Sequence, residues 1–279
     1  MNLKSSKLLK FYAAVLFLWI FGFIIFPHLG LLYSSFTTEE GKFTLTHYKT
    51  FFSHKIYLNT FVYTFLNGIA VTFTAFAFSM PLAFFLVKMV SKKTSSFLTI
   101  ILLIPLGIGE LIVVYGWCVV LGDNGMINYI LKFFSINPVH MVNTPFSMFL
   151  GFLYVSIIFM LLPVMQSIET LDDSLIESAL DLGASKWNIF TKIIIPFTLP
   201  GIISGSIMVF ALVIGDFLIP NLLGGKSALW FTEIIYDDFL STMNWNEGSA
   251  FGFILLLGTM VIIWLFLKLT RQKYAKVVK

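Results

Sequence analysis

The stretch Glu177-Ser-Ala-Leu-Asp-Leu-Gly183, followed after nine residues by Ile193-Ile-Ile-Pro196, is a polar segment between two long apolar stretches. Asp172 to Ser174 are favourable for capping the start of a helix, and Gly183 is favourable just beyond the end of one. We therefore predict a short helix over 173–182.

A second short helix is expected after this glycine. Ser185 can cap it, and Trp187, Phe190 and Ile194 recur at helical spacing before Pro196 and Pro200. The sequence of this segment thus predicts two short helices at an angle to each other. Such a pair is marginally stable alone, and we expect it to offer Leu175, Ile176, Ala179 and Leu182 to a partner with a matching groove.

The alternative is that this pair lies flat on the membrane surface. Interfacial helices favour basic polar faces, whereas the acidic residues here are Glu169, Asp172, Asp173, Glu177 and Asp181. The charge pattern therefore favours a protein partner.

The composition around this segment is that of a membrane protein. Of 279 residues, 58% are hydrophobic and only 11% are charged. Apolar stretches long enough to cross a bilayer as helices occur at 8–33, 59–87, 97–121, 145–167, 200–222 and 249–267. We predict an all-α membrane protein with six transmembrane helices in one domain over 1–279, in which 169–199 forms a loop between the fourth and fifth spans.

The first span follows three lysines, as a signal peptide does, but its apolar run is much longer than a signal peptide's. We interpret it as a retained anchor. Thirteen of the 18 basic residues fall on the side of the predicted N-terminus, and they are Lys4, Lys7, Lys10, Lys88, Lys92, Lys93, Lys186, Lys192, Lys268, Arg271, Lys273, Lys276 and Lys279. The positive-inside rule then places both termini and the 169–199 loop in the cytoplasm.

Several other classes of function find no support in the sequence. The net charge of +4 follows from this asymmetry and requires no nucleic acid, and the single Cys118 excludes disulfides and cysteine metal sites. The four histidines have no ligand spacing, so we assign no metal and no catalytic residues.

Gly225-Lys226-Ser227 resembles the end of a phosphate-binding loop. That motif requires a glycine five residues before Gly225, where this chain has Pro220, and the predicted topology places the segment outside the cell. The chain is therefore expected to lack an ATPase of its own.

Two acids are predicted within the spans, where an ionisable group costs about 2.5–3.5 kcal/mol on insertion scales. Glu110 follows the helix-breaking run Pro105-Leu-Gly107-Ile-Gly109, and Asp216 lies in the fifth span. Helical rise places them about 20 and about 24 Å from the cytoplasmic ends, at similar depth. They are candidates for binding a cation in a translocation pathway, and Trp117 lies seven residues after Glu110 on nearly the same face. The alternatives are a structural acid for Glu110 and an interfacial acid for Asp216.

The predicted external segment 227–248 carries acids and no basic residue, and its candidates for attracting cations are Tyr236, Asp237 and Asp238. A solvated face or a docking surface remains an alternative for these residues.

The polar segment also resembles the signature loop of ABC-importer permeases of the binding-protein-dependent family. That loop reads Glu-Ala-Ala, three residues, Gly, nine residues, Ile, one residue, Leu-Pro. The chain has Glu177-Ser178-Ala179, Gly183, Ile193 and Ile195-Pro196, with Ser178 and Ile195 as mild departures. The surrounding residues, including Asp181 to Lys186 and Pro200 to Ile202, are similar to those of spermidine/putrescine permease subunits.

The resemblance implies a type I importer permease fold in a bacterial inner membrane, working by alternating access. It implies that the first loop helix is a coupling helix, with Glu177, Ser178, Ala179, Gly183, Ile193 and Pro196 as its signature positions. It also implies a second, related permease subunit, two ABC ATPase subunits that hold ATP and Mg, and an external polyamine-binding protein. No cofactor is expected in this chain.

The cargo and the mechanism have alternatives. Permeases for thiamine, ferric iron and sulfate share the loop, and an ion-coupled secondary transporter using Glu110 is a different class. Transport by the purified chain without any ATPase would favour that second class.

Overall fold

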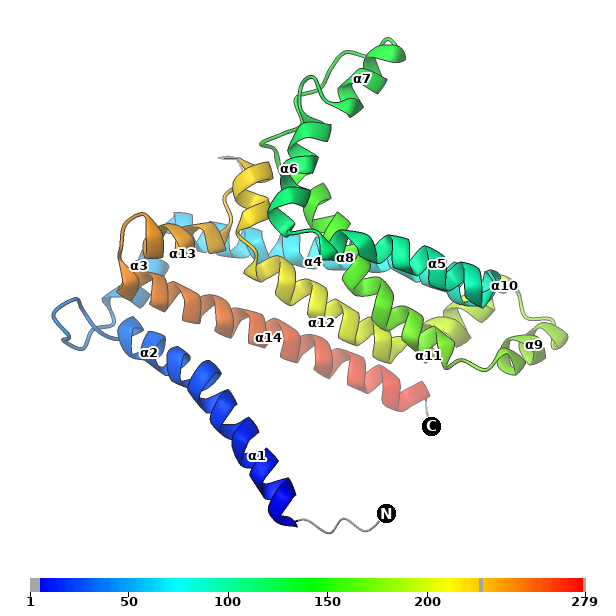
Figure 1. Ribbon diagram of the computed structural model, residues 1–279, viewed down its shortest axis with the longest axis horizontal. Coiled ribbons are helices and arrows are strands. Elements are labelled where there is room, and N and C mark those ends of the chain that lie inside the picture. Colours follow the sequence, from blue (N-terminus) through cyan, green and yellow to red (C-terminus); the bar gives the residue numbers. More distant parts are fainter. Residues whose placement is uncertain (1–5, 226–227, 278–279) are drawn as a thin grey trace. The chain divides into compact units, whose positions relative to one another are not determined.

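The computed structural model describes residues 6–225 and 228–277, and the described chain is almost entirely helical (Figure 1). Lys4, Lys226, Ser227 and Lys279, on which some of the expectations above rest, lie outside the described residues. The chain divides into two compact units, one of Met1–Leu58 with Ile234–Leu257 and one of Asn59–Glu233 with Gly258–Lys279.

The first unit contains the N-terminal helical run and the turn that follows it. Its elements are α1 (Ser6–Ile20), the π-helical turn η1 (Phe21–Ile25), α2 (Phe26–Ser35), α3 (Thr46–Ser53), most of α13 (Phe231–Leu240) and the beginning of α14 (Trp245–Val277). Asn246 Nδ2 donates to the Ser34 and Thr37 carbonyl oxygens at 2.9 and 2.7 Å. These bonds tie the end of α2 to the start of α14.

The second unit is built around α8 (Pro145–Glu169) and α12 (Leu199–Gly215), which pack against each other (Figure 1). Gly205 allows this close approach, since a Cβ at that position would lie 2.8 Å from Met160 Sδ. A Cβ on Gly201 would overlap the Pro163 carbonyl oxygen. Small residues at this spacing let backbones come together inside a bilayer.

The helix α4 (Lys55–Phe84) runs on through the π-helical turn η2 (Phe85–Met89) and forms one continuous candidate span, Lys55–Met89. Other single-helix candidates are Lys10–Ser35, Glu110–Phe133, Pro145–Glu169 and Trp245–Lys268. Within the described chain, five helices are long and apolar enough to cross a membrane, and there are six if one bent pair counts as a span.

The predicted third span, 97–121, is not one helix. It consists of α5 (Lys92–Leu103), the 3-10 helix η3 (Ile104–Gly107) and α6 (Glu110–Leu121). Pro105 lacks a backbone N–H and Gly107 adds flexibility, so the α-helical hydrogen bonds are interrupted there. The break leaves Glu110 in the first turn of a new helix.

The predicted fifth span, 200–222, also differs. The helix α12 ends at Gly215, and a separate π-helical turn, η5 (Pro220–Gly224), follows. The short helices preceding α12 meet it at a bend of 66°, and they are α10 (Lys186–Ile189), η4 (Phe190–Ile194) and α11 (Ile195–Phe197). Asp216 lies at the end of α12, and its Oδ1 accepts a hydrogen bond from the Leu218 N–H at 2.7 Å.

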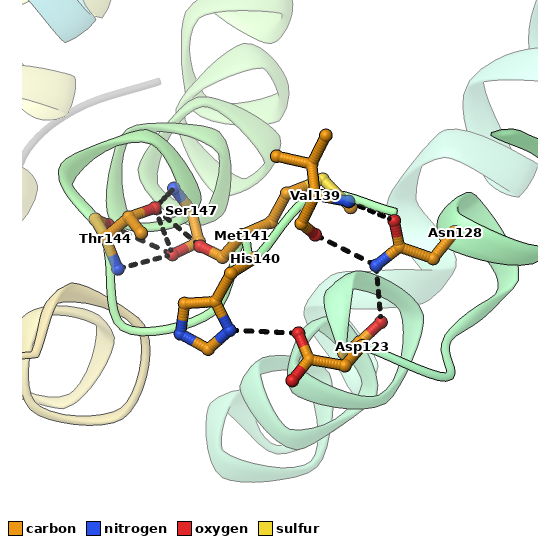
Figure 2. Close-up of polar contacts among 8 residues, drawn as sticks. Asp123, Asn128, Val139, His140, Met141, Thr144 and Ser147 are labelled. Carbon is orange, nitrogen blue, oxygen red and sulfur yellow. Dashed lines mark hydrogen bonds and ion pairs between the residues drawn. The ribbon is translucent and has the colours of Figure 1, made fainter. Parts of the chain in front are cut away.

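The loop between α6 and α8 is folded rather than extended (Figure 2). It contains α7 (Met126–Phe133), from which the buried Asn128 makes three hydrogen bonds. Its Nδ2 donates to the Gly122 and Val139 carbonyl oxygens at 3.1 and 3.0 Å, and its Oδ1 accepts from the Val139 N–H at 2.8 Å. The exposed His140 Nδ1 and Asp123 Oδ1 lie within hydrogen-bond distance, at 2.9 Å.

Candidate functional site

The first half of the loop between the fourth and fifth predicted spans is a helix with a defined cap at each end. The helix α9 spans Asp173–Asp181, and the Asp172 carboxylate accepts a hydrogen bond from the Ser174 N–H at 3.0 Å. That backbone N–H lowers the pKa of Asp172 from its ordinary value. At the other end Gly183 has a φ of +77°, and its N–H donates to the Leu180 carbonyl oxygen at 2.8 Å.

The second half of the loop follows the predicted pattern. Ser185 caps α10 by accepting from the Asn188 N–H at 3.2 Å, and Ile194 is buried at the end of η4. Pro196 lies in α11, directly before the bend into α12. Glu177, Ser178 and Gly183 are exposed, whereas Ala179, Ile193 and Pro196 are partly buried.

The structure corrects the prediction of which side chains this loop offers to a partner. Ile176 and Ala179 pack against the hydrophobic core instead of facing outward. Leu182 and Trp187 are 88% and 70% exposed, and Leu175 and Leu180 are about half exposed. We call these four residues, Leu175, Leu180, Leu182 and Trp187, the loop apolar face. Exposed apolar side chains beside an acidic helix form a surface suited to a protein partner.

The two acids predicted within the spans come together. Glu110 begins α6 and Asp216 follows the last residue of α12, and their carboxyl groups are close enough to interact electrostatically. Asp216 Oδ1 is held by the Leu218 and Ile219 N–H groups at 2.7 and 3.4 Å. Neither carboxyl forms a salt bridge within the described part of the chain.

Both acids line a cavity of about 690 Å³ between η3, α6, α8 and the end of α12. Its walls are mostly apolar, with Tyr154, Phe159 and Phe217 as aromatic members. Such a space, apolar with a few converging polar groups, is typical of a small-molecule site.

Trp117 is not among the residues that line this cavity. Its ring meets Tyr154 edge to face, with 5.5 Å between centroids, and Tyr154 itself lines the cavity. The sequence did not identify Tyr154 as a cavity residue, because Tyr154 on α8 is far in the sequence from Glu110 on α6.

The acids predicted on the external segment belong to the first unit. Tyr236 and Asp237 are exposed on α13, and Asp238 is partly buried beside Glu247. Burial, and then the charges of Glu247 and Asp237, raise the pKa of Asp238 to about 7. Within the described residues, no group of three His, Cys, Asp or Glu is placed to hold a metal ion.

Comparison with known proteins gives a consistent result. Residues 56–273 match the family model described as binding-protein-dependent transport system inner membrane component. The spermidine/putrescine transport system permease protein PotB of Haemophilus influenzae is 31% identical over 95% of this chain and 95% of that protein. The PotB protein of Escherichia coli K12 is 31% identical over 88% of this chain and 92% of that protein.

A solved structure extends the comparison to the fold. The crystal structure of a bacterial alginate ABC transporter, in complex with an alginate pentasaccharide-bound periplasmic protein, contains a chain that matches with a TM-score of 0.82. The match covers 96% of this chain and 95% of that chain at 19% identity, so the likeness concerns the fold alone.

Proposed function

The chain belongs to the family of binding-protein-dependent transport system inner membrane components, and from that premise we propose that it carries polyamines such as spermidine and putrescine. It is an ABC importer permease, a non-catalytic, multi-pass inner-membrane subunit. Systems of this family work with an ATPase and an external binding protein.

The observation that carries the polyamine proposal is the pair of carboxyl groups in the 690 Å³ cavity. A polyamine presents ammonium groups joined by short alkyl chains. Glu110 and Asp216 offer negative charge, no basic side chain is among the described residues that line the cavity, and the apolar walls suit the alkyl segments. Tyr154 adds an aromatic face that can contact a cation. The two PotB relatives, named for spermidine and putrescine transport, support the same cargo.

The loop apolar face is proposed as the docking surface for an ABC ATPase subunit. The four side chains are exposed beside the acidic residues Glu177 and Asp181, and acidic groups can select a basic partner surface. We assign the signature positions Glu177, Ser178, Ala179, Gly183, Ile193 and Pro196 to this coupling role. ATP and Mg belong to the partner ATPase.

The working unit in this proposal has a second, related permease subunit, two ATPase subunits and an external polyamine-binding protein. Closure of the ATPases would move the coupling loop and switch the cavity between the two sides of the membrane. Tyr236, Asp237 and Asp238 would attract the cation at the outer side.

Reconstituted uptake of radiolabelled spermidine tests the cargo. Glu110→Gln and Asp216→Asn should each reduce uptake about tenfold while the complex still assembles, because each removes one charge that faces the cation. Asp123→Asn, which changes an exposed acid of the α6–α8 loop, is the control and should transport normally. Normal uptake by both cavity variants would remove the carboxyl pair from the pathway.

Two other outcomes would redirect the proposal. ATP-dependent uptake of thiamine, ferric iron or sulfate, with no uptake of spermidine, would assign another cargo to the same permease. Transport by the purified chain alone would favour an ion-coupled carrier that uses Glu110.

A further inference from the structure

Lys88 forms hydrogen bonds that connect the end of the span containing α4 to the loop between α8 and α10. It lies in η2, and its Nζ donates to the Leu171 carbonyl oxygen at 2.7 Å and to Asp173 Oδ1 at 2.6 Å. The Lys88 side chain is only 13% exposed, whereas that of Asp173 is 71% exposed. Lys88 therefore directs its charge toward two specific acceptors rather than into open water.

The two acceptors, Leu171 and Asp173, lie at the short connection between α8 and α9. Leu171 follows the end of α8 and is buried in the hydrophobic core, and Asp173 is the first residue of α9. The residue between them, Asp172, is the N-cap of α9. Lys88 thus forms hydrogen bonds with the residues on either side of Asp172, at the junction of α8 and α9.

Packing does not fill the space beside this junction. A cavity of about 640 Å³ lies there, lined by Lys88, Lys92, Ser95, Glu169 and Asp172 among others. Polar and charged side chains therefore line much of that side, and the charge-assisted hydrogen bonds of Lys88 contribute to the position of the junction together with the buried Leu86 and Leu171.

We propose that Lys88 is a positioning residue that transmits movement of the coupling helix α9 to the end of α4. The proposal rests on the coupling role assigned to α9 above. The covalent chain connects α9 only to α8 and α10, whereas Lys88 joins it to a span more than 80 residues earlier. When an ATPase subunit displaces α9, the ion pair and the carbonyl bond carry the displacement to the span Lys55–Met89.

The competing explanation is that Lys88 is an ordinary snorkelling lysine at a membrane interface. Such a lysine keeps its ammonium group in water, and its replacement by methionine has little effect. A purely structural lysine is a further possibility, and its loss would unfold the docking surface and release the ATPase. The three explanations predict different results for the same variant.

The test uses the complete transporter, with its ATPase subunits and external binding protein, in lipid nanodiscs. Tyr154→Cys in a Cys118→Ser background reports, through maleimide labelling, on access to the 690 Å³ cavity. Three quantities are measured: retention of the ATPase during purification, ATP hydrolysis, and the change in labelling rate on addition of ATP with vanadate. None of them depends on the identity of the cargo.

We expect Lys88→Met to retain the ATPase and to hydrolyse ATP, while the nucleotide-dependent change in labelling falls about fivefold or more. Asp173→Asn, which leaves the Leu171 bond, should give an intermediate loss, and Lys88→Arg should preserve more of the change than Lys88→Met. Lys92→Met is the matched control, because Lys92 lines the same cavity and is exposed. It should behave as the unmodified protein does.

Two results for Lys88→Met overturn the proposal. A nucleotide-dependent change equal to that of the unmodified protein would identify a snorkelling lysine, and loss of the ATPase would identify a structural one. Failure of the unmodified chain to bind an ATPase at all would instead overturn the coupling function from which this inference starts.

Discussion

Gly183 is the residue at which backbone conformation matters most for the coupling loop. Its φ of +77° is disfavoured for residues with a Cβ, yet no atom lies within 4 Å of where a Cβ would be placed. The requirement is therefore conformational and not steric. The turn separates α9, which carries Leu175 and Leu180, from α10, which carries Trp187.

Gly183→Val should weaken the turn by about 1–2 kcal/mol, the penalty for a left-handed conformation. We expect reduced retention of the ATPase and reduced uptake. Gly183→Asn is the control, since asparagine tolerates this conformation and fits the same open space. Normal ATPase retention and uptake in the valine variant would show that the turn is not needed for coupling.

Asp238 predicts that the stability of the folded protein depends on pH, and the direction of its pKa shift gives the sign. Its pKa is about 7 in the folded protein against an ordinary value of 3.8, because burial and the charges of Glu247 and Asp237 disfavour the carboxylate. The folded state therefore holds this proton more tightly than the unfolded state does. The contribution of Asp238 to stability falls as pH rises from about 4 to about 7 and is constant above that.

We expect Asp238→Asn to flatten the pH dependence of the melting temperature in detergent over this interval, with Glu39→Gln, an exposed acid, as the control. Equal slopes for the unmodified protein and Asp238→Asn would contradict the assignment.

At the scale of elements, the contact between α8 and α12 depends on Gly201 and Gly205. A side chain at Gly201 would meet the Pro163 carbonyl oxygen, which is backbone and cannot turn aside. Gly201→Leu should therefore destabilise the protein by about 1–3 kcal/mol or more. Gly116→Leu in α6 is the matched control, because nothing lies within 4 Å of a Cβ there. Thermal melting of the two variants checks this, and equal melting temperatures would contradict it.

The hydrogen bonds of the buried Asn128 join α7 to the segment that follows it (Figure 2). Asn128→Ala removes three hydrogen bonds and leaves the Val139 N–H without its acceptor, so we expect local opening worth about 1–3 kcal/mol. Hydrogen exchange over residues 122–141 measures it. Asp123→Asn, which alters only the exposed contact with His140, should have little effect. Unchanged exchange in Asn128→Ala would show that the loop is held by other contacts.

Capping and turn residues in the sequence predicted individual helices well. Contacts between segments distant in the sequence were predicted poorly. The caps at Asp172 and Ser185, and the turn at Gly183, were visible in the sequence because they involve neighbouring residues. Pro105, Gly107 and Gly109 marked an interruption before Glu110, but the division of the predicted span 97–121 into two helices was not predicted. The end of α12 at Gly215 was not predicted, since an apolar pattern continues past it while the Asp216 side chain caps the next turn. In the sequence, Lys88 contributed only to the charge distribution that predicts orientation. Its hydrogen bonds could not be predicted, because their acceptors are 83 and 85 positions away.

At the scale of the whole molecule, the orientation of the chain in the membrane decides whether the coupling loop can reach a cytoplasmic ATPase. The distribution of basic residues predicts a cytoplasmic N-terminus, and the same rule places α9 on the cytoplasmic side. Docking of an ATPase requires that placement, since ATP is cytoplasmic. The cavity acids and the coupling loop can act in one transport cycle only if the loop faces inward.

Cysteine labelling tests this orientation directly. In a Cys118→Ser background, Ser178→Cys lies on the exposed face of α9 and Asn137→Cys lies in the exposed loop after α7. A membrane-impermeant maleimide applied to intact cells, with the outer membrane permeabilised where one is present, should label Asn137→Cys and leave Ser178→Cys unmodified. Inverted vesicles should give the reverse, because only then does α9 face the reagent. Labelling of Ser178→Cys in intact cells would place α9 outside and exclude both ATPase docking on the loop apolar face and transmission through Lys88.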